Sequence, residues 1–377
     1  MIKINILSPG RFHVCDLARE LDKHGFDVKF YSFVPAKRAE RFGLPRKCSA
    51  SILPVIAPFL FIERKVFKNK GWAHRLRILI QDFVTGIYMR KCDICIAMTG
   101  DFVYAPRLAK QKGAIIIYER GSKYIMEQKK VLESIPSLNG KNPVPAFNVK
   151  REIESYELAD YIAIASQHVR NSFLQYKFPQ NKLFLNPYGV DLSMFQPASK
   201  GEREYDVIMV GGWSYRKGCD LIIEAIRQTN LKFLHVGGIV DISFPKDHPN
   251  FTHIDAVDQT KLINYYHQAK VFLLPSREEG LAMVQAQAIA CNLPMVGSPD
   301  SGAEDLKQMV ANSNCIIIIK EYTAESITKG IKEALRQYEN LQGYYAGDAI
   351  RKLTWEAYGN RYAEFINKIV INRNSLS

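Results

Sequence analysis

The stretch from Leu273 to Leu306 reads LLPSREEGLAMVQAQAIACNLPMVGSPDSGAEDL, and its pattern decides the fold class of the chain. It predicts a buried strand that ends at Pro275, a polar loop, a helix of small residues from Leu281 to Cys291, and a second buried strand. Asn292 suits the position after a helix C-terminus, and the proline at 294 prevents the helix from continuing. This order of elements is typical of a parallel α/β sheet.

The loops of the same stretch indicate a binding site for an anion. The helix that follows Glu279 and Gly280 presents unpaired backbone N–H groups at the end of the preceding strand. A second turn, from Ser298 to Ala303, opens another helix at the same edge of the sheet. Because helix N-termini favour anions, two of them at one edge predict a phosphate site.

Two motifs in this stretch, S-R-E-E-G and Q-A-x-A-x-N-L-P, resemble the donor-site signature of family 4 retaining glycosyltransferases. In that family a Glu-Gly pair starts the helix, and a second Glu eight positions later contacts the ribose of the nucleotide. The first position corresponds to Glu279 and the second to Gln287. The resemblance implies an α/β fold called GT-B, in which two Rossmann-like domains with parallel sheets face a central cleft and a C-terminal helix crosses back to the first domain.

The resemblance extends to segments before and after the stretch from Leu273 to Leu306. Residues 186–197 match the hinge pattern N-x-x-G-V-D-x-x-x-F-x-P, and the helix start at Thr354-Trp355-Glu356 resembles the start of the family's final helix. We therefore expect residues 1–197, completed by 356–377, to form an acceptor-side domain. Residues 198–355 are expected to form the nucleotide-sugar-binding domain.

The start of each expected domain carries a glycine loop after a strand. Strand 2–7 ends at Ser8-Pro9-Gly10 and is followed by a helix, which is the opening of a Rossmann-like domain, although the G-x-G-x-x-G fingerprint is absent. Strand 206–210 is followed by a loop that contains Gly212, Arg216 and Lys217. Glycines allow close approach of the backbone, and the two cations reach phosphate oxygens, so this loop suits a diphosphate.

Comparison with the family pattern G-R-x(4)-K-G assigns the charges of this loop. Lys217 fits the lysine of the pattern, the arginine falls on Gly212, and Arg216 supplies a charge nearby. At the end of strand 114–118, Arg120 lies where the family often has a histidine. It would meet an anionic group of the donor or acceptor with Glu119 as its ion-pair partner, or it would form an internal ion pair only.

The candidate residues follow from these assignments. Base recognition is expected around 256–258, and Gln287 is read as a variant ribose contact, because an amide can still bond two hydroxyl groups; the alternative is a structural glutamine on a helix wall. The candidate catalytic residues are Glu279, Lys217 and Arg120. The candidate donor-binding residues are Gly10, Gly212, Arg216, Lys217, Val257, Glu279, Gly280, Leu281 and Gln287.

The activity that the resemblance implies is retaining transfer of a hexosyl or N-acetylhexosaminyl group from a UDP- or GDP-linked sugar to a glycan or polyprenyl-linked acceptor, in synthesis of a cell-surface polysaccharide such as lipopolysaccharide, O-antigen or capsule. Because Lys217 and Arg216 can neutralise the leaving diphosphate, and no Asp-x-Asp pair is found, we expect chemistry without a metal or other cofactor. The alternatives are a non-catalytic nucleotide-sugar binder and a GT-B epimerase that acts on sugar nucleotides.

Composition places the protein among globular chains and points to an anionic partner. The chain has 377 residues, of which 47% are hydrophobic, and no stretch resembles a signal peptide or a membrane span, so a cytoplasmic protein is expected. Its seven cysteines, including Cys92 and Cys95, are expected to be buried thiols. The first 195 residues hold 31 Lys and Arg against 17 Asp and Glu, so all of the excess positive charge lies there.

This basic half fits nucleic acid, anionic lipid or a phosphate-bearing acceptor. No nucleic-acid-binding motif supports the first. Between Phe59 and Arg77 aromatic residues alternate with cations, which suits a lipid headgroup region, so we expect a peripheral position at the inner face of the membrane; the alternative is a helix pair with a solvated basic face. The residues of this run are Phe59, Phe61, Arg64, Lys65, Phe67, Lys68, Lys70, Trp72, Arg75 and Arg77.

Overall fold

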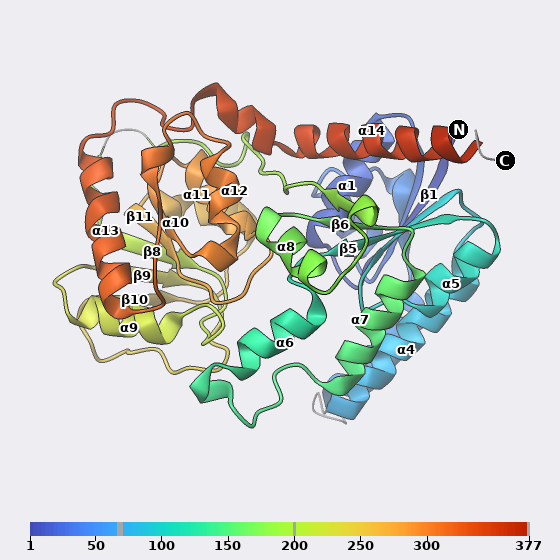
Figure 1. Ribbon diagram of the computed structural model, residues 1–377, viewed down its shortest axis with the longest axis horizontal. Coiled ribbons are helices and arrows are strands. Elements are labelled where there is room, and N and C mark those ends of the chain that lie inside the picture. The colour runs from blue at the N-terminus through green and yellow to red at the C-terminus, as the bar shows by residue number, and fades with distance from the viewer. Residues whose placement is uncertain (66–70, 199–200, 375–377) are drawn as a thin grey trace.

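The computed structural model describes residues 1–65, 71–198 and 201–374, which form two α/β domains (Figure 1). The first contains a seven-stranded parallel sheet in the order β3-β2-β1-β4-β5-β6-β7. Its strands are β1 (Lys3–Leu7), β2 (Asp27–Ser32), β3 (Ser49–Ser51), β4 (Ile94–Met98), β5 (Ile115–Arg120), β6 (Tyr161–Ile164) and β7 (Leu183–Leu185). Its helices are α1 (Phe12–Lys23), α2 (Ala36–Glu40), α3 (Leu53–Lys65), α4 (Gly71–Tyr88), α5 (Tyr104–Gln111), α6 (Ile125–Glu133), α7 (Ala146–Leu158) and α8 (Gln167–Gln175).

The second domain contains a six-stranded parallel sheet in the order β10-β9-β8-β11-β12-β13. Its strands are β8 (Tyr205–Val210), β9 (Phe233–Val236), β10 (Phe251–Ile254), β11 (Ala269–Leu274), β12 (Met295–Gly297) and β13 (Ile316–Ile318). Its helices are α9 (Cys219–Arg227), α10 (Leu262–Tyr266), α11 (Met283–Ala290), α12 (Ala303–Lys307) and α13 (Ala324–Glu339), and α14 (Trp355–Asn374) follows them.

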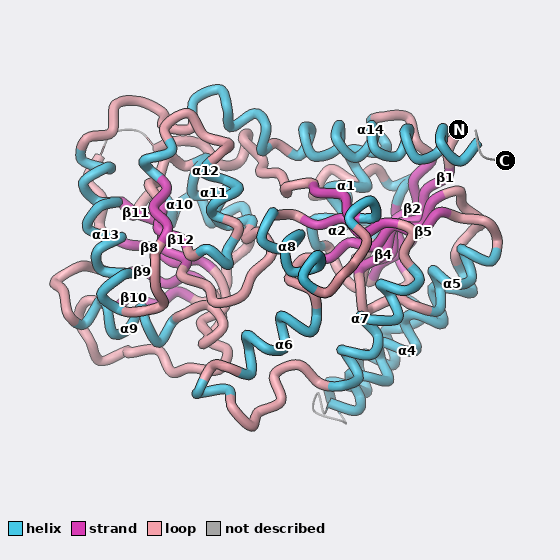
Figure 2. Tube along the Cα trace, viewed as in Figure 1, coloured by secondary structure: helices cyan, strands magenta, loops and turns pink. Residues whose placement is uncertain are grey.

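Parallel strands covered by helices on both faces need apolar side chains on both sides, and the central strands have them. In β5 the first four residues are buried and apolar, ahead of the buried Glu119 and Arg120 at its end, and in β11 five of six residues are buried. Helices lie on both sides of each sheet in Figure 2. In parallel sheets of this kind, ligands bind at the edge formed by the carboxyl ends of the strands and the polar loops that follow them.

The last helix, α14, leaves the second domain and packs against the first (Figure 1). The ring of Phe365 stacks on Phe184 with 4.1 Å between centroids, and Gly359 approaches the Glu20 side chain of α1 so closely that a Cβ would lie 2.4 Å from it. The predicted GT-B architecture, including the crossing C-terminal helix, is therefore confirmed. The expected boundary at Pro197 falls between β7 and β8.

Details of the opening stretch also agree with the sequence. Asn292 has a φ of 64°, the left-handed conformation expected after a helix C-terminus. The helix itself begins at Met283, two residues later than predicted. All seven cysteines are buried free thiols. Within the described ranges, no helix combines the length and the apolar character needed to cross a bilayer.

Candidate active site

Two loops that follow neighbouring strands of the second sheet bring the predicted donor-binding charges together. Lys217 lies in the loop after β8 and Glu279 in the loop after β11, and their side chains form an ion pair. Arg216 Nη2 lies 3.5 Å from the other carboxylate oxygen of Glu279. Gly218 makes this approach possible, because a Cβ there would lie 2.5 Å from the carbonyl oxygen of Pro275. The three predicted residues therefore form one cluster.

Glu278 is a functional candidate that the sequence reasoning missed. It is fully buried, and its carboxylate accepts hydrogen bonds from Ser122 Oγ and from Gln128 Nε2, the latter at 3.2 Å. Arg216 Nε lies 2.8 Å from the same carboxylate. Ser122 and Gln128 belong to the first domain, whereas Arg216 belongs to the second. Glu278 therefore joins the two domains beside Glu279.

The charge state of Glu278 follows from its partners. Burial alone would raise the pKa of this carboxyl, but the Arg216 guanidinium and the hydrogen bond from Ser122 lower the pKa below its ordinary value. Glu278 is therefore ionised at neutral pH. The only sequence signal for it is the doublet Glu278-Glu279, of which the family pattern explains the second residue alone.

The backbone around Gly280 is in direct contact with the first domain. Ser166 Oγ donates to the carbonyl oxygen of Gly280 at 2.9 Å, and His168 Nε2 donates to that of Glu279 at 2.8 Å. Burial lowers the pKa of His168, so the ring is neutral and carries its proton on Nε2. A Cβ on Gly280 would lie 2.3 Å from the carbonyl oxygen of Gly121. The site is thus closed by contact between the two domains.

Gly280→Ala is expected to prevent this closure, because the added methyl group meets backbone that cannot move aside. We expect turnover to fall by about 100-fold, as for a misplacement of reacting groups by about 1 Å. Small-angle scattering with donor present should show a larger radius of gyration. Gly201→Ala is the control, because nothing lies within 4 Å of its Cβ position. Unchanged turnover and radius in Gly280→Ala would contradict the closed contact.

Gln287 lines a cavity of about 140 Å³ between the domains. Its Oε1 lies 3.0 Å from the hydroxyl of Tyr266, which also lies 3.2 Å from the carbonyl oxygen of Val284. Among the described residues, the amide nitrogen of Gln287 has no hydrogen-bond partner. One end of this side chain is therefore fixed by Tyr266, and the other is available to a hydroxyl group in the cavity, as the predicted ribose contact requires.

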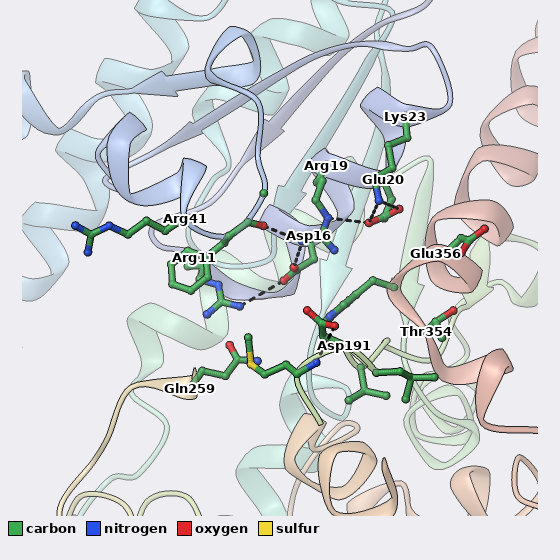
Figure 3. Close-up of a pocket in the computed structure, with 16 residues that line it drawn as sticks. Arg11, Asp16, Arg19, Glu20, Lys23, Arg41, Asp191, Gln259, Thr354 and Glu356 are labelled. Atoms are coloured by element: carbon green, nitrogen blue, oxygen red, sulfur yellow. Dashed lines mark hydrogen bonds and ion pairs between the residues drawn. The ribbon is translucent and has the colours of Figure 1, made fainter. Parts of the chain in front are cut away.

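A larger cavity of about 420 Å³ adjoins the first, and Arg11, Asp16 and Gln259 line both. Figure 3 shows its wall, in which charges from α1 pair with one another. Arg19 Nη1 lies 2.7 Å from Asp16, and Arg19 Nε lies 2.8 Å from Glu20. Val190, Asp191 and Trp355 also line both, so the two cavities extend from Gln287 to the hinge near residue 191.

Arg120 lines neither cavity. It is buried, and its guanidinium donates to Glu152 Oε1 at 2.6 Å, to Gln128 Oε1 at 2.7 Å and to the carbonyl oxygen of Lys123 at 2.7 Å. The expected pairing with Glu119 is wrong, because Glu119 lies 3.0 Å from His13 Nε2 instead. The structure thus has the internal ion pair that was the alternative for Arg120. Through Gln128, this arginine orients a partner of Glu278.

The remaining predicted residues mostly pack within the fold. Gly212 follows β8 with Val240 Cγ2 3.0 Å from its Cβ position, and half-buried Val257 lies in the loop after β10. Leu281 is buried against Gly302. Gly10 follows β1 but lines neither of the two cavities, whose walls include the next two residues, 11 and 12.

The second helix start predicted near Ser298 differs from the expectation. A short turn at Pro299–Ser301 is followed by Gly302 with a φ of 80° and then by α12, which has only five residues. Asp300 pairs with Lys123 of the first domain at 2.7 Å. This segment therefore serves the contact between the domains, and of the two predicted helix starts only the one at α11 opens a helix of eight residues.

The fold and the charged cluster at the cleft define a protein of the GT-B class. Residues 192–346, which include most of the second domain, match the family model described as glycosyl transferases group 1. Among solved structures, the chain is similar to sucrose-phosphate synthase from Thermosynechococcus elongatus, with a TM-score of 0.64 and 15% identity over 99% of this chain and 100% of that one. The chain is also similar to Anabaena HepE in complex with UDP and glucose, with a TM-score of 0.66 and 13% identity over 98% of this chain and 100% of that one.

The matches to curated relatives cover only part of each protein. One is a component of the phosphatidylinositol N-acetylglucosaminyltransferase of Arabidopsis thaliana, which is 21% identical over 250 residues that cover 62% of this chain and 55% of the relative. A probable sucrose-phosphate synthase of Thermosipho melanesiensis is 21% identical over 226 residues, which cover 54% of this chain and 51% of the relative. The chain thus spans about half the length of the curated relatives that it matches.

Proposed function

We propose that the protein is a retaining glycosyltransferase of family 4 that transfers a sugar from a nucleotide-sugar donor. The observation that carries this proposal is the cluster of Lys217, Arg216 and Glu279 just before α11, the helix whose residues Met283 and Gln287 line a cavity. The cations would hold the diphosphate, the cavity would take the nucleoside, and Glu279 would bond hydroxyl groups of the sugar. All of these groups face the boundary between the domains.

Charge stabilisation is the main chemical contribution of this cluster. As the bond between the anomeric carbon and the phosphate oxygen breaks, negative charge grows on that oxygen, and Lys217 and Arg216 can stabilise it. The acceptor oxygen forms the new bond on the same face, and its proton passes to the departing phosphate oxygen. Configuration is then retained without a separate base. We propose that no metal ion is needed, so EDTA should leave turnover unchanged.

The donor and acceptor are proposed by class. A UDP- or GDP-linked hexose or N-acetylhexosamine fits the site, and UDP donors deserve priority because HepE is similar in fold and was solved with UDP-glucose. The acceptor is proposed to be a glycan or a polyprenyl-linked sugar in the synthesis of a cell-surface polysaccharide. The basic first domain, with 31 cations among 195 residues, supports an anionic lipid-linked acceptor at a membrane surface.

The deciding experiment combines binding and turnover. In a thermal-shift panel of UDP- and GDP-sugars, a true donor at 100 times its Kd should stabilise the fold by about 2.7 kcal/mol. The donor that binds is then supplied with polyprenyl-linked acceptors, and the anomeric configuration of the product is read by NMR. Binding without transfer would support the non-catalytic alternative, which Gly212 in place of the family's arginine also favours. Epimerised donor would support the epimerase.

Replacement of Gln287 tests the nucleoside end of the site. Gln287→Leu is expected to weaken donor binding by about 1–3 kcal/mol, because a ribose hydroxyl loses its partner in a buried place. Gln287→Glu should bind about as well as the wild type, since a carboxylate accepts from hydroxyl groups. Calorimetric titration with the donor measures both. Equal affinity in all three proteins would assign Gln287 to structure only.

A further inference from the structure

Helix α4 has its polar and apolar faces reversed relative to an ordinary surface helix. It buries Gln81, Asp82 and Thr85 against the first domain. Its exposed face carries apolar side chains that are between 39% and 59% exposed and recur at steps of three or four residues, which places them on one face. They are Trp72, Leu76, Leu79, Phe83 and Ile87. We call these five residues the α4 stripe.

The neighbouring helix α3 widens this apolar face. It packs on α4, and its side chains Val55, Phe61 and Ile62 are exposed. Eighteen large apolar side chains are exposed in the described part of the chain, and nine of them lie on these two helices. Such a concentration on two helices that pack together exceeds the scattered apolar residues that are normal on a soluble surface, which indicates an interaction surface.

The charges around the α4 stripe favour an anionic partner. The two carboxylates between residues 53 and 91 are both buried in ion pairs: Glu63 lies 3.2 Å from Arg77, and Asp82 lies 2.7 Å from Arg151. The exposed charges of this segment include Lys65 and Lys91, and no described carboxylate there is exposed. The face therefore combines apolar side chains with cations at its edges.

We infer that the α3–α4 face inserts into the headgroup boundary of a bilayer that contains anionic lipid. Apolar side chains then enter the acyl region while cations remain beside lipid phosphates. A second copy of the chain fits less well, because a twofold contact would bring the cations of both copies together. Of the run expected from the sequence, Phe61, Lys65 and Trp72 belong to this face, whereas Arg77 points inward to Glu63. Phe67, Lys68, Lys70 and the side chain of Arg64 lie outside the described residues.

This placement connects the bilayer to the cleft. In Figure 1, α4 lies on the side of the first domain opposite α14. Helix α4 contributes the exposed His74 and the buried Ile78 to a small cavity with Thr99 and Asp101, which follow the carboxyl end of β4. That end belongs to the edge of the sheet that binds ligands. The inference rests on the proposed function in one respect: the bilayer would present the lipid-linked acceptor at this edge of the sheet.

Vesicle binding of the full chain tests the inference. The wild type should float with vesicles of phosphatidylcholine and phosphatidylglycerol and remain partly bound at high salt, because apolar insertion is not screened. The charge-neutral variant Leu79→Ser/Phe83→Ser should lower the partition coefficient at least about tenfold. Ile371→Ser, an exposed apolar residue on α14, is the matched control and should bind like the wild type.

Tryptophan fluorescence gives a second readout. Trp213 and Trp355 are buried, whereas Trp72 is half exposed, so a blue shift on vesicles and quenching by brominated lipid would report Trp72. No vesicle binding by the wild type, binding lost entirely at high salt, or equal binding by the double serine variant would overturn the inference. So would a wild-type dimer that the double variant dissociates. Donor stabilisation and transfer to a water-soluble acceptor, measured on the same variants, show separately whether the proposed function holds.

Discussion

Lys217→Ala is expected to lower turnover by 100- to 1,000-fold while the fold survives, which is the usual loss when one positioned donor to a developing anion is removed. The ammonium group of Lys217 forms an ion pair with Glu279 at the proposed diphosphate position and does not contribute to either hydrophobic core. Its loss removes charge where the leaving group develops it. Arg216 remains, since it is anchored by Glu278, so some activity should persist.

The measurement is the initial rate of transfer with the donor identified by thermal shift, together with the melting temperature of the variant. Lys332→Ala, an exposed lysine on α13, is the matched control and should behave as the wild type. We also expect donor affinity to fall less than turnover, because the charge on the diphosphate increases towards the transition state. A turnover number in Lys217→Ala equal to that of the control would refute the assignment.

Local sequence patterns predicted the parallel α/β class of the fold, and the family resemblance implied its two-domain GT-B arrangement. Parallel strands such as β11 are continuous apolar runs, and the stop at Asn292 and the following proline fix the end of α11 within one residue. Lys217 and Glu279 were both assigned to the donor site, and the structure brings them together because they follow neighbouring parallel strands. The resemblance to a known family then gave these residues their expected roles.

Contacts between distant segments were not predicted. Glu278 meets Ser122 across 156 positions, and no local pattern indicates a carboxylate buried between two domains. Arg120 was placed correctly at a strand end, but the direction of its side chain depends on Glu152, which lies on another element. The run from Phe59 to Arg77 suggested lipid from its composition, whereas the apolar stripe became visible only when the structure showed which side of α4 is buried.

Asp82→Ala is expected to reduce the free energy of unfolding by about 3–5 kcal/mol, the usual result of breaking a buried ion pair by removing one partner. Asp82 is buried in α4, and its carboxylate accepts from Arg151 Nη2 at 2.7 Å. It also accepts from the backbone N–H groups that begin α5, those of Val103, Tyr104 and Ala105, at 2.8–2.9 Å. Alanine leaves an uncompensated guanidinium and three unpaired amides in the interior.

Urea denaturation measures this change, and two further variants separate its causes. In Asp82→Ala/Arg151→Met the unpaired cation is gone, so part of the stability should return, while the unpaired amides at the start of α5 still cost free energy. Asp82→Asn keeps an acceptor for those amides and should lie between the wild type and Asp82→Ala. Glu333→Ala, which breaks an exposed pair with Arg336 on α13, should change little. Asp82 holds α4 against α5 and α7, so vesicle binding should weaken together with stability in Asp82→Ala. If Asp82→Ala is as stable as the wild type, this buried cluster does not hold α4 in place.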